Sequence, residues 1–364
     1  MSDMLKKALK KGPPPKSNSG DSENDSEEED EVAELDDVDF PKDKPADLSK
    51  YSPLNWSDYM DLIGYISYGI PVYYTKGEND VIFFCIHGAG ISAASFCLLA
   101  KELKPFASFA SYDIMGHGLN KYSDESLDMS IDSLVAEATN VLEYLATRFP
   151  SATFVIVGHS MGGSIAASVA NKAHKGEYGD VLKERVVGLV VIDISEGHAM
   201  YALPFMKNLV LSRPSKFSDI KSAIKYMISS NTLHNLEAAR VSTQTMFTEK
   251  DDKLVWRVDL LKTEKHWAEW FNNVNKNFLE CGLPKILLLA HPDRMDKELT
   301  IAQMQGKFKL VVLNKEVGHH VHEDEPKETA KEFREFLKFS RLPLNCDQIE
   351  QLREVGPGFF KNDL

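Results

Sequence analysis

The chain has 364 residues, of which 43% are hydrophobic, and a formal net charge of −13. This length allows one large core with an insertion, and the negative charge argues against nucleic acid as a general partner. No run of about eighteen apolar residues or apolar N-terminal signal segment is present, so we expect no membrane span and no secretion. The four cysteines (Cys85, Cys97, Cys281 and Cys346) lack pairing or metal-ligand spacing, which favours a reduced compartment, cytoplasmic, nuclear or both.

Residues 1–48 differ in composition from the rest of the chain. A lysine-rich start is followed by residues 21–40, which hold twelve Asp or Glu and no Lys or Arg. Such a segment cannot bury enough apolar surface to offset its ordering entropy, so we predict a disordered arm. A solubilising tail is the simplest interpretation. Phosphorylation at Ser22 or Ser26, or a nuclear import signal among the lysines, would give the arm a regulatory role instead.

From Tyr51 onward, apolar strand patterns alternate with amphipathic helix patterns. We predict an early strand or hairpin over 65–74. Continuous apolar runs then predict buried strands over 81–86, 106–110, 154–157 and 186–193. Apolar residues at helical spacing predict a helix over 131–148. This order predicts an α/β fold with a mostly parallel, doubly wound sheet flanked by helices.

The stretch Gly158-His159-Ser160-Met161-Gly162 lies between the apolar strand 154–157 and an Ala-rich helical segment. Strand, G-x-S-x-G and helix together are the context of a nucleophile elbow, whose sharp turn lifts a serine hydroxyl clear of the sheet. Gly158 and Gly162 are needed where the strand and helix pass too close for a Cβ. The pattern alone is weak and also fits a turn without chemistry, but its flanks favour Ser160 as a nucleophile.

The strand 81–86 ends in a glycine-rich loop, His87-Gly88-Ala89-Gly90. Such a loop can turn backbone N–H groups into a site, and in α/β-hydrolases it supplies one of two oxyanion donors. We therefore predict the N–H groups of Ala89 and Met161 as the oxyanion hole, with a plain glycine turn as the alternative. His117, in a D-x-x-G-H-G segment, is expected to hold its loop rather than act as a base.

The alternation stops after Asp193. Residues 198–277 contain helical patterns and no strand-like run, which predicts a helical cap inserted before the next strand, 285–290. Its aromatic residues are expected mainly to pack the cap, with a substrate pocket as the alternative; they are Trp256, Trp267, Trp270 and Phe271. The final strand is predicted over 308–313 and the closing helix over 326–339. The hydrolase domain therefore covers 49–341, followed by an irregular tail over 342–364.

A serine hydroxyl needs a base to accept its proton. Only three histidines (His319, His320 and His322) follow the last predicted strand, and Gly318 would let the loop turn His319 inward, so we predict His319 as the base. A metal site here would need inward carboxylates that the sequence does not place. The acid is open: Asp293 or Asp296 fits the usual chain order of the fold, while Asp193 could also reach the histidine, and each could simply cap a loop.

Several further motifs resemble one family. They are Gly158–Gly163, Ile192-Asp193 with Glu196-Gly197, Ser212-Arg213-Pro214, 235–242, 262–265, 296–308, and Gly318-His319 with 321–324. On these motifs the chain, over about 51–340, resembles the protein phosphatase methylesterases, eukaryotic members of the α/β-hydrolase superfamily that demethylate the catalytic subunit of protein phosphatase 2A. The N-terminal arm lies outside the resemblance, and the cap segment 247–254 is shorter than the charged insertion of some relatives.

The resemblance implies a catalytic Ser160, a base His319 and an acid Asp193, and so selects Asp193 over Asp293. It implies hydrolysis, without a cofactor, of the methyl ester on the phosphatase's C-terminal leucine, through an acyl-enzyme. The implied partner is that subunit's C-terminal tail, with no nucleic acid and no membrane. It also implies that the family can bind and inactivate the phosphatase. A general carboxylesterase or lipase, and a phosphatase-binding module with secondary catalysis, remain as alternatives.

Overall fold

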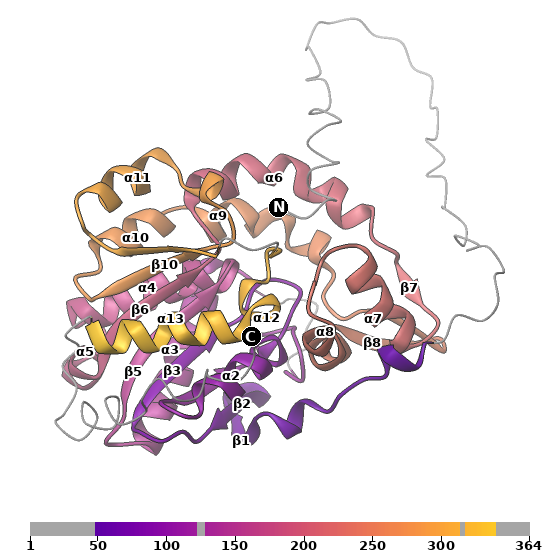
Figure 1. Cartoon of the computed structure of the whole chain (residues 1–364), viewed down its shortest axis with the longest axis horizontal. Coiled ribbons are helices and arrows are strands. Elements are labelled where there is room, and N and C mark those ends of the chain that lie inside the picture. The colour runs from indigo at the N-terminus through magenta and orange to yellow at the C-terminus, as the bar shows by residue number, and fades with distance from the viewer. Residues whose placement is uncertain (1–47, 122–127, 314–316, 340–364) are drawn as a thin grey trace, which may run out of the picture.

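The predicted apolar strands pair into one eight-stranded sheet in the computed structural model, which describes residues 48–121, 128–313 and 317–339 (Figure 1). The strand order is β1-β2-β4-β3-β5-β6-β10-β11. The pairs β1–β2 and β2–β4 are antiparallel, and all pairs from β4 to β11 are parallel. The strands are β1 (Asp61–Ile66), β2 (Ile70–Thr75), β3 (Val81–Ile86), β4 (Ser108–Tyr112), β5 (Thr153–His159), β6 (Val186–Ile192), β10 (Lys285–Leu289) and β11 (Lys309–Val312).

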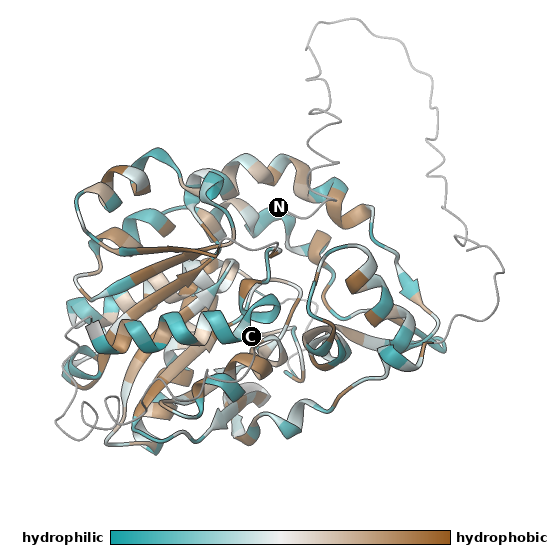
Figure 2. Ribbon diagram, in the orientation of Figure 1, coloured by the Kyte–Doolittle hydropathy of each residue, from teal (hydrophilic) through white to brown (hydrophobic). Residues whose placement is uncertain are grey.

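The central strands are buried on both faces, which is why their sequences are continuously apolar rather than alternating. In β3, Ile82 and Phe84 belong to one core cluster, and Phe83 and Cys85 belong to a second cluster on the opposite face. Figure 2 shows the resulting apolar centre beneath helices with more polar outer surfaces. Both apolar faces of the sheet need cover, and helices lie on each of them. The predicted α/β architecture is therefore confirmed.

Two groups of helices provide that cover. The first face packs against helices that contribute to the cluster with Ile82: α3 (Ile131–Arg148), α4 (Met161–Lys175), α10 (Val274–Glu280) and α11 (Lys297–Met304). The second face packs against α2 (Cys97–Leu103) and α13 (Pro326–Phe339), where Phe333 stacks on Phe83 at 5.0 Å between ring centroids. Short helices α5 (Asp180–Arg185) and α12 (Val321–Asp324) complete the connections. The bounds predicted for α3 and α13 match the structure.

The insertion between β6 and β10 is mostly helical, as expected. It contains α6 (Glu196–Leu211), α7 (Ile220–Ser229), α8 (Leu236–Ser242) and α9 (Trp267–Phe271). In Figure 1, α6 runs along the top of the molecule, and α7 and α8 lie together to the right of the sheet. The cluster of Phe217, Ile224 and Met227 gives this side its own apolar core. Trp267 and Trp270, by contrast, belong to the main core.

The expectation that 198–277 holds no strand was wrong. A small antiparallel sheet of order β7-β9-β8 lies within it, formed by β7 (Lys216–Phe217), β8 (Phe247–Lys250) and β9 (Lys253–Trp256). Asp251 and Asp252 join β8 to β9 with φ values of 51° and 57°. Two left-handed residues give the tight hairpin loop that matches strand twist, and Asp tolerates this conformation. Strands of two to four residues carry too little alternation to be recognised in the sequence.

Three cysteines that the structure describes (Cys85, Cys97 and Cys281) are buried and free, while Cys346 lies outside the described residues. The predicted arm, apart from Leu48, and the predicted tail also lie outside them. Within the described residues, no helix is both long enough and apolar enough to cross a membrane.

Candidate active site

Ser160 occupies a strained turn between the end of β5 and the start of α4. Its backbone has φ 53° and ψ −123°. All the other non-glycine residues with positive φ in the described part of the chain are Asp or Asn, which adopt this region more readily. The Ser160 N–H donates to the carbonyl of Ile192 on β6, at 3.0 Å. This strained serine is therefore fixed to the neighbouring strand, as a nucleophile elbow requires.

The two elbow glycines lie where backbones touch. A Cβ at Gly158 would overlap the carbonyl of Gly162, and a Cβ at Gly162 would overlap the carbonyls of Ile86 and His87 at the end of β3. Backbone atoms cannot yield as a flexible side chain does. The sequence requirement for glycine at these positions thus follows from the close approach of β3, β5 and α4.

Asp193 follows β6 directly and holds a buried carboxylate. Its Oδ1 accepts a hydrogen bond from the N–H of Ala290 at 2.9 Å, and its Oδ2 lies 2.7 Å from Nδ1 of His319. Its φ of 57° turns the side chain off the end of the strand. Because the carboxylate accepts a hydrogen bond from Nδ1–H, the proton stays on Nδ1. Nε2 of His319 therefore keeps the lone pair that a general base needs.

The two fold-based candidates for the acid lie elsewhere. Asp296 caps α11 by accepting from the N–H of Leu299 and also accepts from Nδ2 of Asn275, at 3.0 and 2.7 Å. Asp293 is exposed, and no hydrogen bond or ion pair among the described residues joins it to His319. The geometry therefore brings together Asp193 and His319, the pair that the family resemblance selected.

A buried arginine that the sequence analysis did not single out lies beside this pair. Nη1 of Arg294 contacts Oδ2 of Asp193 and lies 3.1 Å from Nδ1 of His319. Both nitrogens are donors once Nδ1 carries its proton, so they converge on one carboxylate oxygen. Burial, followed by the Arg294 charge and His320, lowers the pKa of His319 well below its ordinary value, and burial lowers the pKa of Arg294 to about 10.

The glycine-rich loop after β3 is held by two buried histidines. Nε2 of His87 accepts from the N–H of Ile114 at 3.0 Å, so its Nδ1 donates to the carbonyl of Gly88 at 2.8 Å. In a trans peptide the next N–H points the opposite way, so the N–H of Ala89 is turned away from His87. His117 accepts from the N–H of Gly90 at 3.0 Å, consistent with the loop-holding role expected for it.

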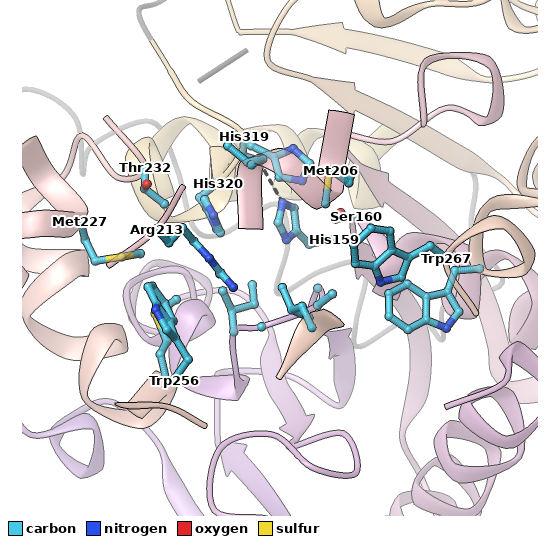
Figure 3. Close-up of a pocket in the computed structure, with 18 of the residues that line it drawn as sticks. His159, Ser160, Met206, Arg213, Met227, Thr232, Trp256, Trp267, His319 and His320 are labelled. Carbon is cyan, nitrogen blue, oxygen red and sulfur yellow. Dashed lines mark hydrogen bonds between the residues drawn. The ribbon is translucent and has the colours of Figure 1, made fainter. Parts of the chain in front are cut away.

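His159, next to the nucleophile, connects the elbow to the histidine loop. Its Nε2 donates to the carbonyl of His319 at 2.9 Å (Figure 3). Burial, followed by the neighbouring His319 and His320, lowers the pKa of His159 well below its ordinary value, which keeps this ring neutral. His320 and His322 are buried around it rather than on the surface. No group of three or more His, Cys, Asp or Glu within 48–121, 128–313 and 317–339 could hold a metal ion.

A pocket of about 210 Å³ connects these groups, since Ser160, His319 and the loop Gly88–Gly90 all line it. The insertion forms much of the rest of its wall, including α6 and all the aromatic residues for which the sequence left a pocket role open (Trp256, Trp267, Trp270 and Phe271). Figure 3 shows Trp256 and Arg213 on one side of the pocket and Trp267 on the other, with Ser160 and the histidines between. These aromatic residues therefore both pack the insertion and line the pocket.

Comparison with known proteins places the chain in a family. The model of the alpha/beta hydrolase family matches residues 83–332. The chain is 39% identical over 296 residues to a Caenorhabditis elegans protein named probable protein phosphatase methylesterase 1, with 80% of this chain and 79% of that protein covered. It is 31% identical over 365 residues to the Homo sapiens protein phosphatase methylesterase 1, with 86% and 91% covered. The chain belongs to the protein phosphatase methylesterase family.

Membership in this methylesterase family makes the chain an esterase of the serine hydrolase type. The Bos taurus relative, also named protein phosphatase methylesterase 1, is 32% identical over 344 residues, covering 80% of this chain and 88% of the relative. Among solved structures, E-2-(acetamidomethylene)succinate hydrolase has a TM-score of 0.59 at 19% identity, covering 74% of this chain and 94% of that one. At that identity the likeness establishes the fold alone.

Three residues of this methylesterase's pocket and its surroundings had no role assigned from the sequence: His159, Arg213 and Arg294. His159 lies within the elbow motif, and Arg213 lies within Ser212-Arg213-Pro214, a segment shared with the family. Arg294 lies between the two fold-based candidate acids. Their positions relative to Ser160 and His319 depend on loop paths, which local sequence patterns do not encode.

Proposed function

We propose that this methylesterase hydrolyses the C-terminal methyl ester of a protein phosphatase 2A-type catalytic subunit, with Ser160 as nucleophile, His319 as base and Asp193 as acid. The observation that carries the proposal is the strained Ser160 lining the same pocket as His319, whose Nδ1 lies 2.7 Å from buried Asp193. The names of the relatives support the choice of a phosphatase as substrate.

The proposed chemistry follows from the residues. Ser160 Oγ attacks the ester carbonyl, and Nε2 of His319 takes the hydroxyl proton while Asp193 stabilises the imidazolium. His319 then protonates the departing methoxide, so methanol leaves. Water, deprotonated by the same histidine, hydrolyses the acyl-enzyme and releases the carboxylate. Among hydrogen bonds of the described residues none joins Ser160 to His319, and such contacts commonly tighten when substrate binds.

The N–H groups of Ala89 and Met161 are the proposed oxyanion donors. Met161 is the first residue of α4, so its N–H has no acceptor within the helix and lies at the positive end of the helix dipole. Ala89 lines the pocket in the loop whose preceding carbonyl is held by His87. Each donor of this kind is typically worth about 3–4 kcal/mol of transition-state stabilisation.

A methyl group offers little surface for recognition, so substrate selection must depend on the rest of the chain that carries the ester. The pocket, at about 210 Å³, is smaller than the roughly 300–1,000 Å³ of sites that enclose drug-sized ligands. A pocket of this size can hold an esterified terminal residue while the rest of a protein substrate lies outside it. Contacts outside the pocket would then align the ester carbonyl with Ser160. A protein terminus can make such outside contacts and a small acyl ester cannot, so we expect these contacts to provide the selectivity.

The test compares methanol release from three substrates: the folded, methylated phosphatase catalytic subunit, a short peptide methyl ester with the same last residues, and a generic acyl ester. We expect the folded protein to give by far the highest kcat/KM. Ser160→Ala should abolish release, by up to about 10⁶-fold in kcat, with the fold intact by circular dichroism. Equal efficiency on the peptide, or better efficiency on the acyl ester, would favour a general carboxylesterase. Inhibition of unmethylated phosphatase by Ser160→Ala would reveal a separate binding function.

A further inference from the structure

Arg213 is the cation of the pocket. It follows α6 and is the one Lys or Arg among the described residues that line the pocket with Ser160 and His319. Figure 3 shows its side chain extending into the pocket between Trp256 and the histidines. The position places a fixed positive charge within a substrate site whose other walls are largely aromatic and aliphatic.

The guanidinium has no polar partner within the part of the chain that the structure describes. No hydrogen bond or ion pair there involves its side chain, and its Nε is buried without a partner. The guanidinium instead lies over the face of Trp256, at 4.3 Å from the ring centroid. Trp256 is itself fixed, because its indole N–H donates to the carbonyl of Pro214 at 2.7 Å. The tryptophan thus forms a rigid platform that holds the guanidinium plane.

An unpaired cation in such a place is costly. Burial lowers the pKa of Arg213, while Tyr226 and Asp259 oppose this shift. Asp259 does not neutralise the charge by contact, because its carboxylate is exposed and accepts instead from the N–H of Leu261 at 3.1 Å. Arg213 is partly buried, with its Nε fully enclosed, and pairing with an anion would offset the desolvation cost of this cation. Since no carboxylate of the described residues pairs with Arg213, an anionic group of the substrate would be its ion-pair partner.

The neighbouring polar groups are already used. The indole N–H groups of Trp267 and Trp270 donate to Thr263 Oγ1 and to the carbonyl of Met129, and Thr232 shares a hydrogen bond with Ser230. The pocket therefore presents ring faces and methyl groups, with Arg213 as its free donor of paired N–H groups. A carboxylate matches that fork with two parallel hydrogen bonds, and a monoanion neutralises a single cation.

We propose that Arg213, supported by Trp256, binds a carboxylate of the peptide whose ester carbonyl lies at Ser160. This inference rests on the proposed function, because it assumes a peptide ester as substrate. The carboxylate could belong to an acidic side chain near the ester or to the C-terminal group released by hydrolysis. An acidic side chain would make the site select acidic peptide esters, whereas the released C-terminal group would make the site hold the product of hydrolysis.

The experiment uses two peptide series. In the first, peptide methyl esters carry Asp or Asn at each of the four positions before the esterified residue, and kcat/KM is measured. In the second, peptides with neutral side chains end in a free carboxylate or an amide, and binding to Ser160→Ala protein is measured by calorimetry. We expect wild-type Arg213 to favour the charged member of at least one pair by about ten- to a hundredfold.

The variants decide the source of the preference. In Arg213→Met the charged-to-neutral ratio should fall to about one, and Arg213→Lys should restore part of it, since charge remains but the paired geometry is lost. Lys225→Met, which removes an exposed charge from α7, is the matched control and should keep the wild-type ratio. If the ratio depends on Arg213 in the first series, the bound group is an acidic side chain. If it depends on Arg213 in the second series, the bound group is the product carboxylate.

Two results would overturn the inference. One is a wild-type ratio of about one in every pair, and the other is a ratio in folded Arg213→Lys and Arg213→Met that equals wild type. Neither would touch the proposed function, which is tested separately by comparing methanol release from the folded phosphatase, the peptide methyl ester and the acyl ester. Thermal unfolding of each variant separates loss of the carboxylate contact from loss of the fold.

Discussion

The pocket has two walls that are built in different ways. The first wall consists of the loops at the ends of β3, β5 and β11, where Ser160 and His319 are held by backbone hydrogen bonds and close glycine contacts, with Asp193 buried behind His319. The second wall comes from the insertion and presents aromatic rings, Met and Leu side chains and Arg213. The first wall holds the proposed reacting groups in place, and the second presents an apolar surface with one positive charge.

This difference separates chemistry from selection. Substitutions in the first wall should lower turnover of every ester, because each substrate needs the same nucleophile, base and oxyanion donors. Substitutions in the second wall should change the ranking of substrates, because only large substrates use those contacts.

The largest effect is expected from the acid. Asp193→Asn should lower kcat by about 10⁴-fold for protein and small esters alike, because the amide favours the wrong imidazole tautomer. Asp293→Asn is the matched control, since Asp293 is exposed in the loop after β10 and should cost much less. Steady-state assays on both variants check this. If Asp293→Asn proves the more damaging change, the acid assignment is wrong.

The elbow should respond through stability as well as rate. In Gly162→Ala the new Cβ would overlap the carbonyls of Ile86 and His87, which should cost about 1–3 kcal/mol and displace Ser160. Thermal unfolding and small-ester turnover measure the two consequences. Ser164→Ala, further along α4, removes a buried hydroxyl without a partner in the described residues and should be neutral or stabilising. An undisturbed Gly162→Ala protein would refute the close approach.

A change in the second wall should be smaller and selective. Met206, on α6, lines the pocket, so Met206→Ala should lower kcat/KM for the folded phosphatase by about tenfold through lost apolar contact. Small-ester turnover should fall much less. Lys207→Ala, at the adjacent exposed position, is the control and should leave both nearly unchanged. An equal loss on both substrates would show that the two walls do not divide the work.

The smallest effect is expected in pH dependence. Burial, the Arg294 cation and His320 lower the pKa of His319, so the neutral, active base persists into acid. Removing the cation in Arg294→Met stabilises the imidazolium and raises that pKa, which moves the acidic limb of kcat/KM to higher pH. Asp193, His159 and His198 also face this site and remain in both proteins. Arg294→Lys keeps the charge and should keep the limb near its wild-type position; a limb that moves to lower pH in Arg294→Met would contradict the assignment.

How much the sequence predicted follows the same division. The first wall was predictable because its residues lie directly at strand ends: Ser160, Asp193 and the loop after β3 each follow an apolar run. Strand patterns alone left Asp193 and Asp293 open, because both follow strands. The family resemblance selected Asp193, and it is Asp193 that lies 2.7 Å from His319 in the structure.

The second wall was less predictable. The helices of the insertion were recognised, but β8 and β9 are too short to show alternation, and their Asp251-Asp252 turn lacks the usual glycine signal. Arg213 gave no sign of its position, because whether a cation pairs with a neighbour or extends into a pocket depends on contacts between distant segments. Patterns along the chain record burial well and such contacts poorly.

The most direct test of the account is covalent labelling with a fluorophosphonate, which reacts with activated serine hydroxyls, followed by peptide mapping with mass spectrometry. Activation depends on the base and acid, so we expect one phosphonylated residue, Ser160, in the wild-type protein and greatly slowed labelling in Asp193→Asn. Labelling of a different serine, or unchanged labelling in a folded Asp193→Asn protein, would contradict the claim that Ser160, His319 and Asp193 act as one catalytic unit.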